Sequence, residues 1–229
     1  MSLADYDPYL YEDSLLDYRP TEVSLQRLLD EVGGFLTSTD DELVEHCACI
    51  AEWLLRHAKF ENYGCAGAVL SVQLADRKLA IKAGIVLRCE AELQDAVEKE
   101  LHLAPPVYSY LPDLELSADL HRYLCPYHGP AERRGTTWKK DAAPCFCRYG
   151  LDLLIMPFCD RRVLKSEVDR RLDARLQAGA TKILKLGQRF KTSPEAGKTP
   201  MWLNGQVVFV DFGDACALET LNLIPPEME

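Results

Sequence analysis

The spacing of apolar residues first changes near residue 60, from a helical period to a strand period. Apolar positions over 21–32 and over 39–58 recur at every third or fourth residue, so each segment predicts an amphipathic helix. Thr39 is followed three positions later by Glu42, which is the capping-box pattern of a helix N-terminus. After Phe60 the next two segments have the period of strands. The pattern therefore predicts a helical extension over 21–59 that precedes a sheet.

The segments after Phe60 predict strands and helices in a mixed order. Strand patterns cover 68–74, 78–83, 107–111, 151–156, 201–203 and 207–210. Helical patterns cover 90–103 and 166–186. Residues 75–77 predict the turn between the first two strands, and Asn204-Gly205 predicts a tighter hairpin near the end. This mixture predicts an α+β fold.

Composition and charge narrow the functional classes. Because 48% of the 229 residues are hydrophobic, the chain can bury a sizeable core. The net charge of −10 argues against nucleic acid as a partner, since phosphate binding needs clustered positive charge. No apolar run approaches the roughly 18 residues of a membrane span, and the acidic N-terminus does not resemble a signal peptide. We expect no membrane association, an intracellular location, cytoplasmic or nuclear, and mostly reduced thiols for the nine cysteines.

Residues 1–20 predict an acidic, disordered tail. The first eighteen residues contain no basic residue and five acids, namely Asp5, Asp7, Glu12, Asp13 and Asp17. They also contain four tyrosines, so the alternative is a tyrosine-bearing motif for a partner. Neither interpretation affects the core.

Three short segments carry candidate chemistry. Gly64-Cys-Ala-Gly67 between strands can serve a tight turn, or it can let backbone N–H groups approach phosphate oxygens. Lys82 ends an apolar strand, where it can be solvent-exposed or can point inward as a point charge for phosphates. Asp211-Phe-Gly follows another apolar strand, and a carboxylate there suits Mg²⁺. The acids that could hold an inward lysine lie in the following helix and are Glu90, Glu92 and Glu98.

Taken in this order, the three segments resemble the eukaryotic-type protein kinase superfamily. Gly64-x-x-Gly67-x-Val69 is similar to the last part of the family's G-x-G-x-x-G-x-V loop, and Leu79-Ala-Ile-Lys82 is similar to its V-A-I-K. Leu153-Leu-Ile-Met-Pro-Phe158 resembles the family's fifth strand and hinge. The resemblance covers about residues 60–215.

The resemblance implies a kinase-like fold that binds ATP and Mg²⁺. Residues 60–160 would form an antiparallel-sheet N-lobe, and 161–229 a truncated, mostly helical C-lobe portion. The residues implied to contact the nucleotide are Gly64, Gly67, Val69, Lys82, Met156, Phe158 and Cys159. Met156 would be the gatekeeper, the backbone of 157–159 would contact adenine, and Asp211 would bind the metal.

The sequence departs from the family where catalysis is performed. Asn62 replaces the first loop glycine, and the stretch 189–198, where H-R-D-L-x-x-x-N belongs, contains no aspartate. The missing groups orient the substrate hydroxyl and hold a second Mg²⁺. Glu195 is the one carboxylate in that stretch and is the weak candidate for a catalytic base.

A second candidate site lies in an insertion predicted over 121–148. Cys125, His128, Cys145 and Cys147 have the donor chemistry of a structural zinc site, although Cys-x-Cys is a less typical pair than Cys-x-x-Cys. The alternative is unlinked cysteines.

These observations leave three functional hypotheses. The first is a catalytically impaired, pseudokinase-like protein that binds ATP and Mg²⁺ and acts by binding another protein, such as a full-length kinase or its substrate. The second is an active phosphotransferase with an atypical catalytic loop. The third is a zinc-stapled structural adaptor whose nucleotide cleft is vestigial.

Overall fold

The computed structural model describes residues 51–52, 54–63, 67–73, 77–85, 88–125, 128, 150–190, 197 and 199–212. These residues form an α+β protein, as predicted, and they divide into two units. The first unit contains the described residues up to 85 and those from 108 to 155. The second contains those from 88 to 107 and from 156 to 212. The predicted tail over 1–20 and the predicted helix over 21–32 lie outside the described residues.

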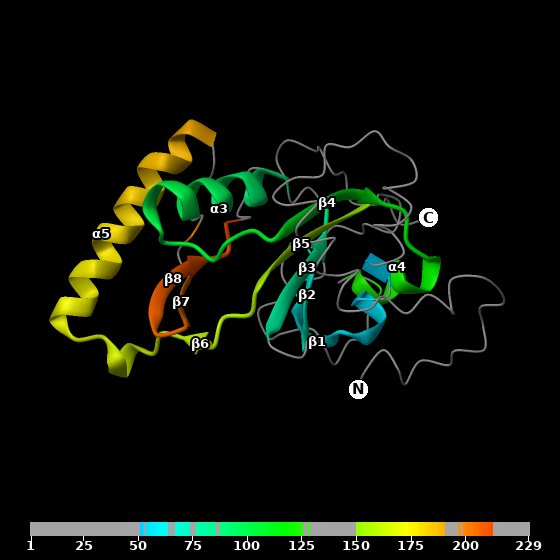
Figure 1. Ribbon diagram of the computed structural model, residues 1–229, viewed down its shortest axis with the longest axis horizontal. Helices are drawn as coiled ribbons and strands as arrows, with labels where there is room; N and C mark the ends of the chain where they lie inside the picture. Colours follow the sequence, from blue (N-terminus) through cyan, green and yellow to red (C-terminus); the bar gives the residue numbers. More distant parts are fainter. Residues whose placement is uncertain are drawn as a thin grey trace. The chain divides into compact units, whose positions relative to one another are not determined.

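The first unit is built on a five-stranded sheet with the order β1-β2-β3-β5-β4 (Figure 1). Its strands are β1 Lys59–Tyr63, β2 Gly67–Gln73, β3 Lys78–Gly84, β4 Ser109–Leu114 and β5 Leu151–Pro157. The pairs β1-β2, β2-β3 and β4-β5 are antiparallel. The predicted hairpin between β2 and β3 is confirmed, and β3 is the central strand.

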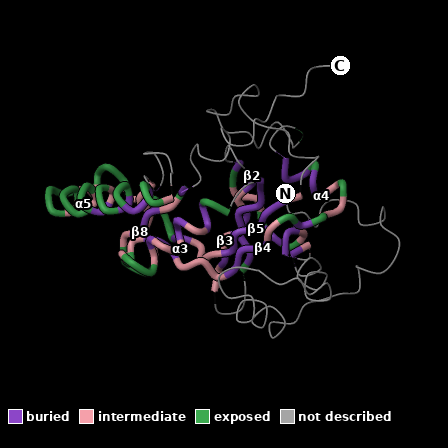
Figure 2. The backbone as a smooth tube through the Cα atoms, turned by 90° about the horizontal axis from the view of Figure 1, so that it is seen from above, coloured by how far each residue is buried: buried purple, intermediate pink, exposed green. Residues whose placement is uncertain are grey.

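Burial in this unit follows from its nearly continuous apolar strands. Residues 151–155 of β5 and 81–84 of β3 are all buried, as the predominantly purple strands in Figure 2 illustrate. Such runs are typical of strands that are covered on both faces. Residues 54–57 are helical and contribute Leu54 and Leu55 to the core, so the predicted helix over 39–58 is confirmed for that part.

Strand β4 begins at Ser109 rather than at the predicted residue 107, and it continues past residue 111 because the sheet accommodates a proline. The register shifts between Leu111 and Leu114, so that Pro112, which has no N–H to donate, lies in an irregular stretch of the strand. Asp113 there has a φ of 52°. The buried Asp152 carboxylate accepts hydrogen bonds from the Tyr110 hydroxyl at 2.9 Å and the Asp113 N–H at 3.0 Å. Asp152 therefore stabilises the bulge from the neighbouring strand.

The second unit combines two helices with a small sheet (Figure 1). The helices are α3 Arg88–Leu101 and α5 Arg170–Gly187, and short 3-10 turns cover Lys165–Glu167 and Gln188–Phe190. The sheet has the order β6-β7-β8, with β6 Arg161–Arg162, β7 Thr199–Leu203 and β8 Gln206–Val210. The core of this unit consists of Leu93, Val97, Ala104, Ile183, Leu186, Phe209 and Phe212.

The predicted hairpin at Asn204-Gly205 is confirmed. Asn204 and Gly205 have φ values of 49° and 76°, and Leu203 pairs with Gln206 across the two-residue loop. Positive φ at both loop positions is the type I′ geometry that matches strand twist. Asp160 supports the loop, because its Oδ2 atom accepts a hydrogen bond from the Asn204 N–H at 3.0 Å.

Helix α5 begins later than the predicted Ser166. Its N-cap is Asp169, whose Oδ1 atom accepts a hydrogen bond from the Leu172 N–H at 2.7 Å. The Glu167 carboxylate is instead bound to the Leu164 N–H and to Arg161, which keeps 165–167 as a separate turn. The sequence reasoning also missed β1, β6 and the helix α4 Ala118–Leu124. Within the described ranges, no helix is long and apolar enough to cross a membrane.

Candidate functional site

Lys82 lies on the central strand of the first unit and is 9% exposed. The solvent-exposed alternative for this lysine is therefore wrong. Lys82 is directly opposite Val69 in the antiparallel pair β2-β3. Since directly opposite residues project from the same face of a sheet, the structure brings these two predicted contacts together.

Gly67 has a role in strand packing, which is different from both roles considered for it from the sequence, a tight turn and a close approach to phosphate. It is opposite Gly84 on β3, and a Cβ atom at Gly67 would lie 2.1 Å from the carbonyl oxygen of Ala83. A side chain would therefore push the two strands apart, so the structure itself requires glycine at this position. Gly64, the other glycine of the segment, lies outside the described residues.

The three acids considered for the lysine differ in their surroundings on α3. Glu92 forms an ion pair with Arg88, with 2.9 Å between carboxylate and guanidinium. Glu98 has a carboxylate oxygen 3.8 Å from Nδ1 of His102. Glu90 is only 3% exposed, which makes it the acid of the three that lies in the interior.

The segment from Met156 to Cys159 contains the last two residues of β5 and the two residues after it, and it belongs to the second unit. Gln94 of α3 is buried there, and its Nε2 atom donates to the carbonyl of Pro105 at 3.0 Å and lies 3.5 Å from Sδ of Met156. Phe158 is half-buried, and Cys159 is buried. Burial, with the nearby Asp160 carboxylate, raises the pKa of the Cys159 thiol to about 11. That thiol is therefore protonated near neutral pH.

Asp211 is exposed at the end of β8, whereas the next residue is buried. Its φ of 70° lies in the left-handed region, and its carbonyl oxygen accepts a hydrogen bond from the Gly197 N–H at 2.9 Å. Phe212, at 2% exposure, fills the core beside Gly197, where a Cβ atom would lie 2.6 Å from the Phe212 ring. The backbone is thus anchored by a phenylalanine at the point where the carboxylate reaches the surface.

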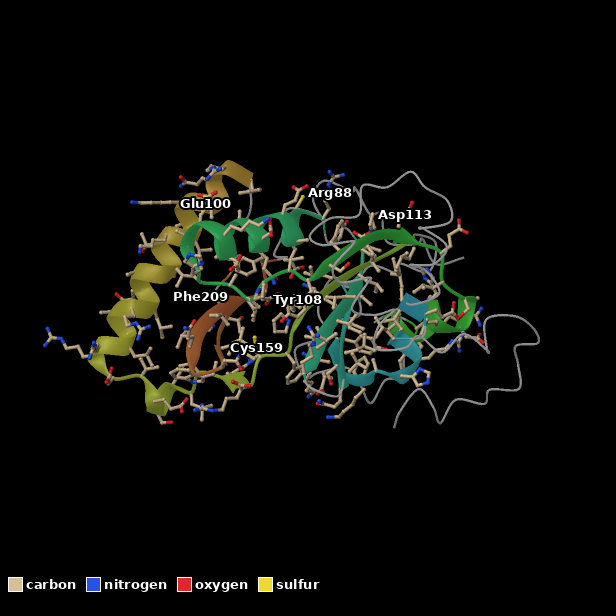
Figure 3. The ribbon with its side chains drawn as sticks, viewed as in Figure 1. Arg88, Glu100, Tyr108, Asp113, Cys159 and Phe209 are labelled. Atoms are coloured by element: carbon tan, nitrogen blue, oxygen red, sulfur yellow. The ribbon has the colours of Figure 1, made fainter. Side chains whose placement is uncertain are left out.

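Phe209 fixes the strand that leads to Asp211. Its N–H donates to the Leu103 carbonyl at 2.7 Å, and its ring lies against Gly179 of α5, where a Cβ atom would lie 2.8 Å from Cε2 (Figure 3). These contacts could not be predicted from the sequence, because no local pattern around Gly179 or Gly197 identifies the side chain that each glycine adjoins.

Parts of the predicted sites lie outside the described residues. Glu195 is among them, and so are Cys145 and Cys147 of the predicted zinc site. Cys125 is buried and His128 is exposed. No group of three or more metal-ligating His, Cys, Asp or Glu side chains occurs in the part of the chain that the structure describes. Cys89, Cys125 and Cys159 form no disulfide among the described residues.

The residues predicted to contact a nucleotide and a metal do not all belong to the same unit. Gly67, Val69 and Lys82 belong to the first, while the three glutamates, Met156, Phe158, Cys159 and Asp211 belong to the second. Neither the models of known protein families nor the curated protein sequences give a match to this chain.

Proposed function

We propose that this chain is a kinase-like protein that binds ATP with Mg²⁺, transfers phosphate poorly and acts by binding another protein. The observation that carries the proposal is the burial of Lys82 on the third strand, directly opposite Val69 of the second strand. In protein kinases the phosphate-binding lysine is on the third strand and the glycine-rich loop precedes it. The same order holds for Gly67, Val69 and Lys82 here.

The environment of Lys82 supports a functional role. Burying an ammonium group costs free energy unless its charge is compensated, and a lysine without a function is more stable with its head in water. On the same strand, Lys78 follows that ordinary behaviour, since its side chain is 37% exposed and lies 3.6 Å from Glu61. The proposal assigns to Lys82 the contact with the phosphates of the nucleotide.

The backbone at Asp211 supports the assignment of the metal. Non-glycine residues in the left-handed region are strained by about 1–3 kcal/mol, and such strain often occurs at functional sites. The exposed Asp211 carboxylate forms no hydrogen bond or ion pair with the described residues, so its oxygens are accessible to a hydrated cation. Mg²⁺ is commonly bound through one or two carboxylates with several waters retained.

The proposed impairment comes from the sequence over 189–198. This stretch has no aspartate to orient a substrate hydroxyl. Losing a positioned base typically lowers a rate by a factor of about 10² to 10⁴. A protein that retains nucleotide contacts without that base is better suited to binding than to turnover, which is why we assign it a protein partner.

Thermal unfolding with ATP and Mg²⁺ tests the proposal. We expect the ligands to raise Tm for the wild type, because a ligand that binds the native state stabilises it. The rise should be lost in Lys82→Met and in Asp211→Asn. Lys78→Met, at a half-buried lysine, and Asp173→Asn, at an exposed aspartate, change the same residue types elsewhere and should keep it.

Two results would contradict the proposal. A wild-type Tm that does not change at millimolar ATP and Mg²⁺ would exclude nucleotide binding of useful affinity. Transfer of labelled phosphate to a protein substrate at an ordinary kinase rate, about 1–100 s⁻¹, and abolished in Asp211→Asn, would show that the chain is an active kinase.

A further inference from the structure

Helix α5 presents a line of basic residues to solvent. Arg171, Arg175, Lys182 and Lys185 are all exposed, and they follow one another at intervals of four, seven and three residues. Ala178, which is also exposed, divides the interval of seven residues between Arg175 and Lys182 into three and four. With Ala178 included, the spacing along the line alternates between four and three residues. At 1.5 Å per residue the line is about 21 Å long. We call these four cations the basic stripe.

The basic stripe differs from four other cations of the second unit, each of which is paired with an acid. Arg161, Arg88, Lys99 and Arg189 form ion pairs with Glu167, Glu92, Asp95 and Glu100, respectively. For the four residues of the stripe, no ion pair to an acid occurs among the described residues. The nearby Asp173 carboxylate accepts a hydrogen bond from Gln177 instead. The stripe therefore keeps its positive charge available.

The buried face of α5 holds the helix in place and so fixes the stripe. Ile183 and Leu186 belong to the core of the second unit, and Gly179 adjoins the ring of Phe209. Because the apolar face is already packed, it is not available to enter a lipid surface, which an interfacial helix requires. Figure 2 shows that most of α5 is exposed. Among the positions on this alternating spacing, the one apolar side chain is that of Ala178, and the exposed Leu184 does not fall on the spacing.

We propose that the basic stripe is the docking surface for an acidic helix of a partner protein. Alternate spacings of four and three residues keep a line of side chains facing one neighbouring helix, as along the seam of a coiled coil. Aspartates or glutamates at the same spacing on a partner would face each cation in turn. The small side chain of Ala178 leaves room at the middle of the contact.

The inference rests on the proposed function in one respect, namely that the chain acts by binding a protein. It does not require a nucleotide, because the stripe shares no residue with the proposed ATP and Mg²⁺ contacts. The stripe also lacks the aromatic side chains on which single-stranded nucleic acid bases stack. Charge and spacing together favour an acidic helix over a polyanion without regular spacing.

Fluorescence anisotropy with labelled peptides tests the inference on the full chain. The probe is a helical peptide of about four heptads with Glu at alternate spacings of three and four. The comparison peptide has the same composition with the Glu positions shuffled. We expect the striped peptide to bind the wild type more tightly than the shuffled one. The affinity should decrease as salt is added, because exposed charges are screened.

A stripe variant and a charge-matched control complete the test. In Arg171→Gln, Arg175→Gln, Lys182→Gln and Lys185→Gln combined, affinity for the striped peptide should fall by about tenfold or more. The control, Arg88→Gln, Lys99→Gln, Arg162→Gln and Lys165→Gln combined, has the same change in net charge at exposed positions of the same unit. It should bind within about twofold of the wild type, and both variants should keep the Tm increase with ATP and Mg²⁺.

The possible outcomes are separable. Equal binding of the shuffled peptide, of a single-stranded oligonucleotide or of phosphatidylserine vesicles would overturn the acidic-helix partner in favour of a general polyanion or lipid surface. No binding of the striped peptide by the wild type would also overturn it, whatever ATP does to Tm. If ATP and Mg²⁺ leave Tm unchanged while the striped peptide binds, the nucleotide proposal fails and the docking surface remains.

Discussion

The candidate residue of the first unit, Lys82, is buried, whereas that of the second unit, Asp211, is exposed. In the first unit Lys82 is part of a buried central strand whose neighbours are apolar. In the second unit Asp211 is exposed, and the buried residue is its neighbour Phe212. In the first unit the charged side chain is held in place by the strands packed around it. In the second unit the charged side chain is held in place because the next residue, Phe212, anchors the backbone in the core.

The difference determines what a substitution would reveal. Changes near Lys82 disturb strand pairing and packing together, so loss of binding there is hard to separate from loss of structure. At Asp211 the side chain can be changed with little effect on the core, because the core contact is made by Phe212. Three predictions test this contrast, beginning with the largest expected effect.

Phe212→Ala should destabilise the second unit most strongly. The ring is 2% exposed and packs in a core with Leu93, Ile183 and Phe209. Large-to-small changes of buried phenylalanine typically cost about 3–5 kcal/mol. Unfolding in urea should show this loss, and hydrogen exchange should become faster in β8 and α3.

Leu164→Ala is the control for Phe212, since Leu164 is 55% exposed. Its effect should stay within about 0.5 kcal/mol, as is usual for surface substitutions. A Phe212→Ala variant that unfolds at the urea concentration of the wild type would mean that Phe212 does not anchor the backbone at Asp211. The contrast between the units would then fail.

Gly67→Ala should destabilise the first unit by a smaller amount. The added Cβ atom would lie 2.1 Å from the Ala83 carbonyl oxygen, so β2 and β3 must move apart. Overpacking of this kind typically costs about 1–3 kcal/mol. Hydrogen exchange of β2 and β3 measures the effect directly, and the Tm increase with ATP and Mg²⁺ should decrease with it.

Gly205→Ala is the matched control in the second unit. Nothing lies within 4 Å of its added Cβ atom, but its φ of 76° disfavours alanine. The cost should therefore be about 1–2 kcal/mol from the backbone alone, without faster exchange in β2 and β3. Slower exchange of β2 and β3 in Gly67→Ala would contradict the packing role of Gly67.

Elements with a strong local signal could be predicted from the sequence. The Asn204-Gly205 hairpin needs positive φ at two successive residues, and few residue pairs supply it. The strand over 151–156 was evident as an apolar run and differs by one residue from β5 Leu151–Pro157. Asp211 was identified as a candidate in the same way, from an acid directly after an apolar strand.

Elements defined by distant contacts could not be predicted. Strand β6 is only Arg161–Arg162, and it exists because both residues pair with β7. The strand predicted over 107–111 ended before Pro112, and the bulge that lets β4 continue past this proline is supported by Asp152, which is 40 positions away in the sequence. The burial of Lys82 likewise depends on its place in the sheet, which strand spacing alone does not give.

Breaking the ion pair between Arg161 and Glu167, at the edge of the second sheet, should have the smallest effect on the free energy of unfolding. The dependence of this effect on pH should show that the ion pair causes it. Two guanidinium nitrogens of Arg161 lie 2.6 Å from the two carboxylate oxygens of Glu167. The pairing with Arg161, with a hydrogen bond from the Leu164 N–H, lowers the pKa of Glu167 from 4.5 to about 2. A lowered pKa in the folded state means that the charged form is stabilised, so the contribution is present above pH 4.5 and is lost as pH falls towards 2.

Glu167→Gln should therefore lower the free energy of unfolding slightly at neutral pH, and the difference from the wild type should disappear as pH approaches 2. High salt should also reduce the difference, because the pair is exposed to solvent. Glu115→Gln, at another exposed acid, controls for the change in net charge. A difference that grows below pH 4 would show that Arg161 does not stabilise the Glu167 carboxylate, and the short turn over 165–167 would then need another explanation for ending before α5.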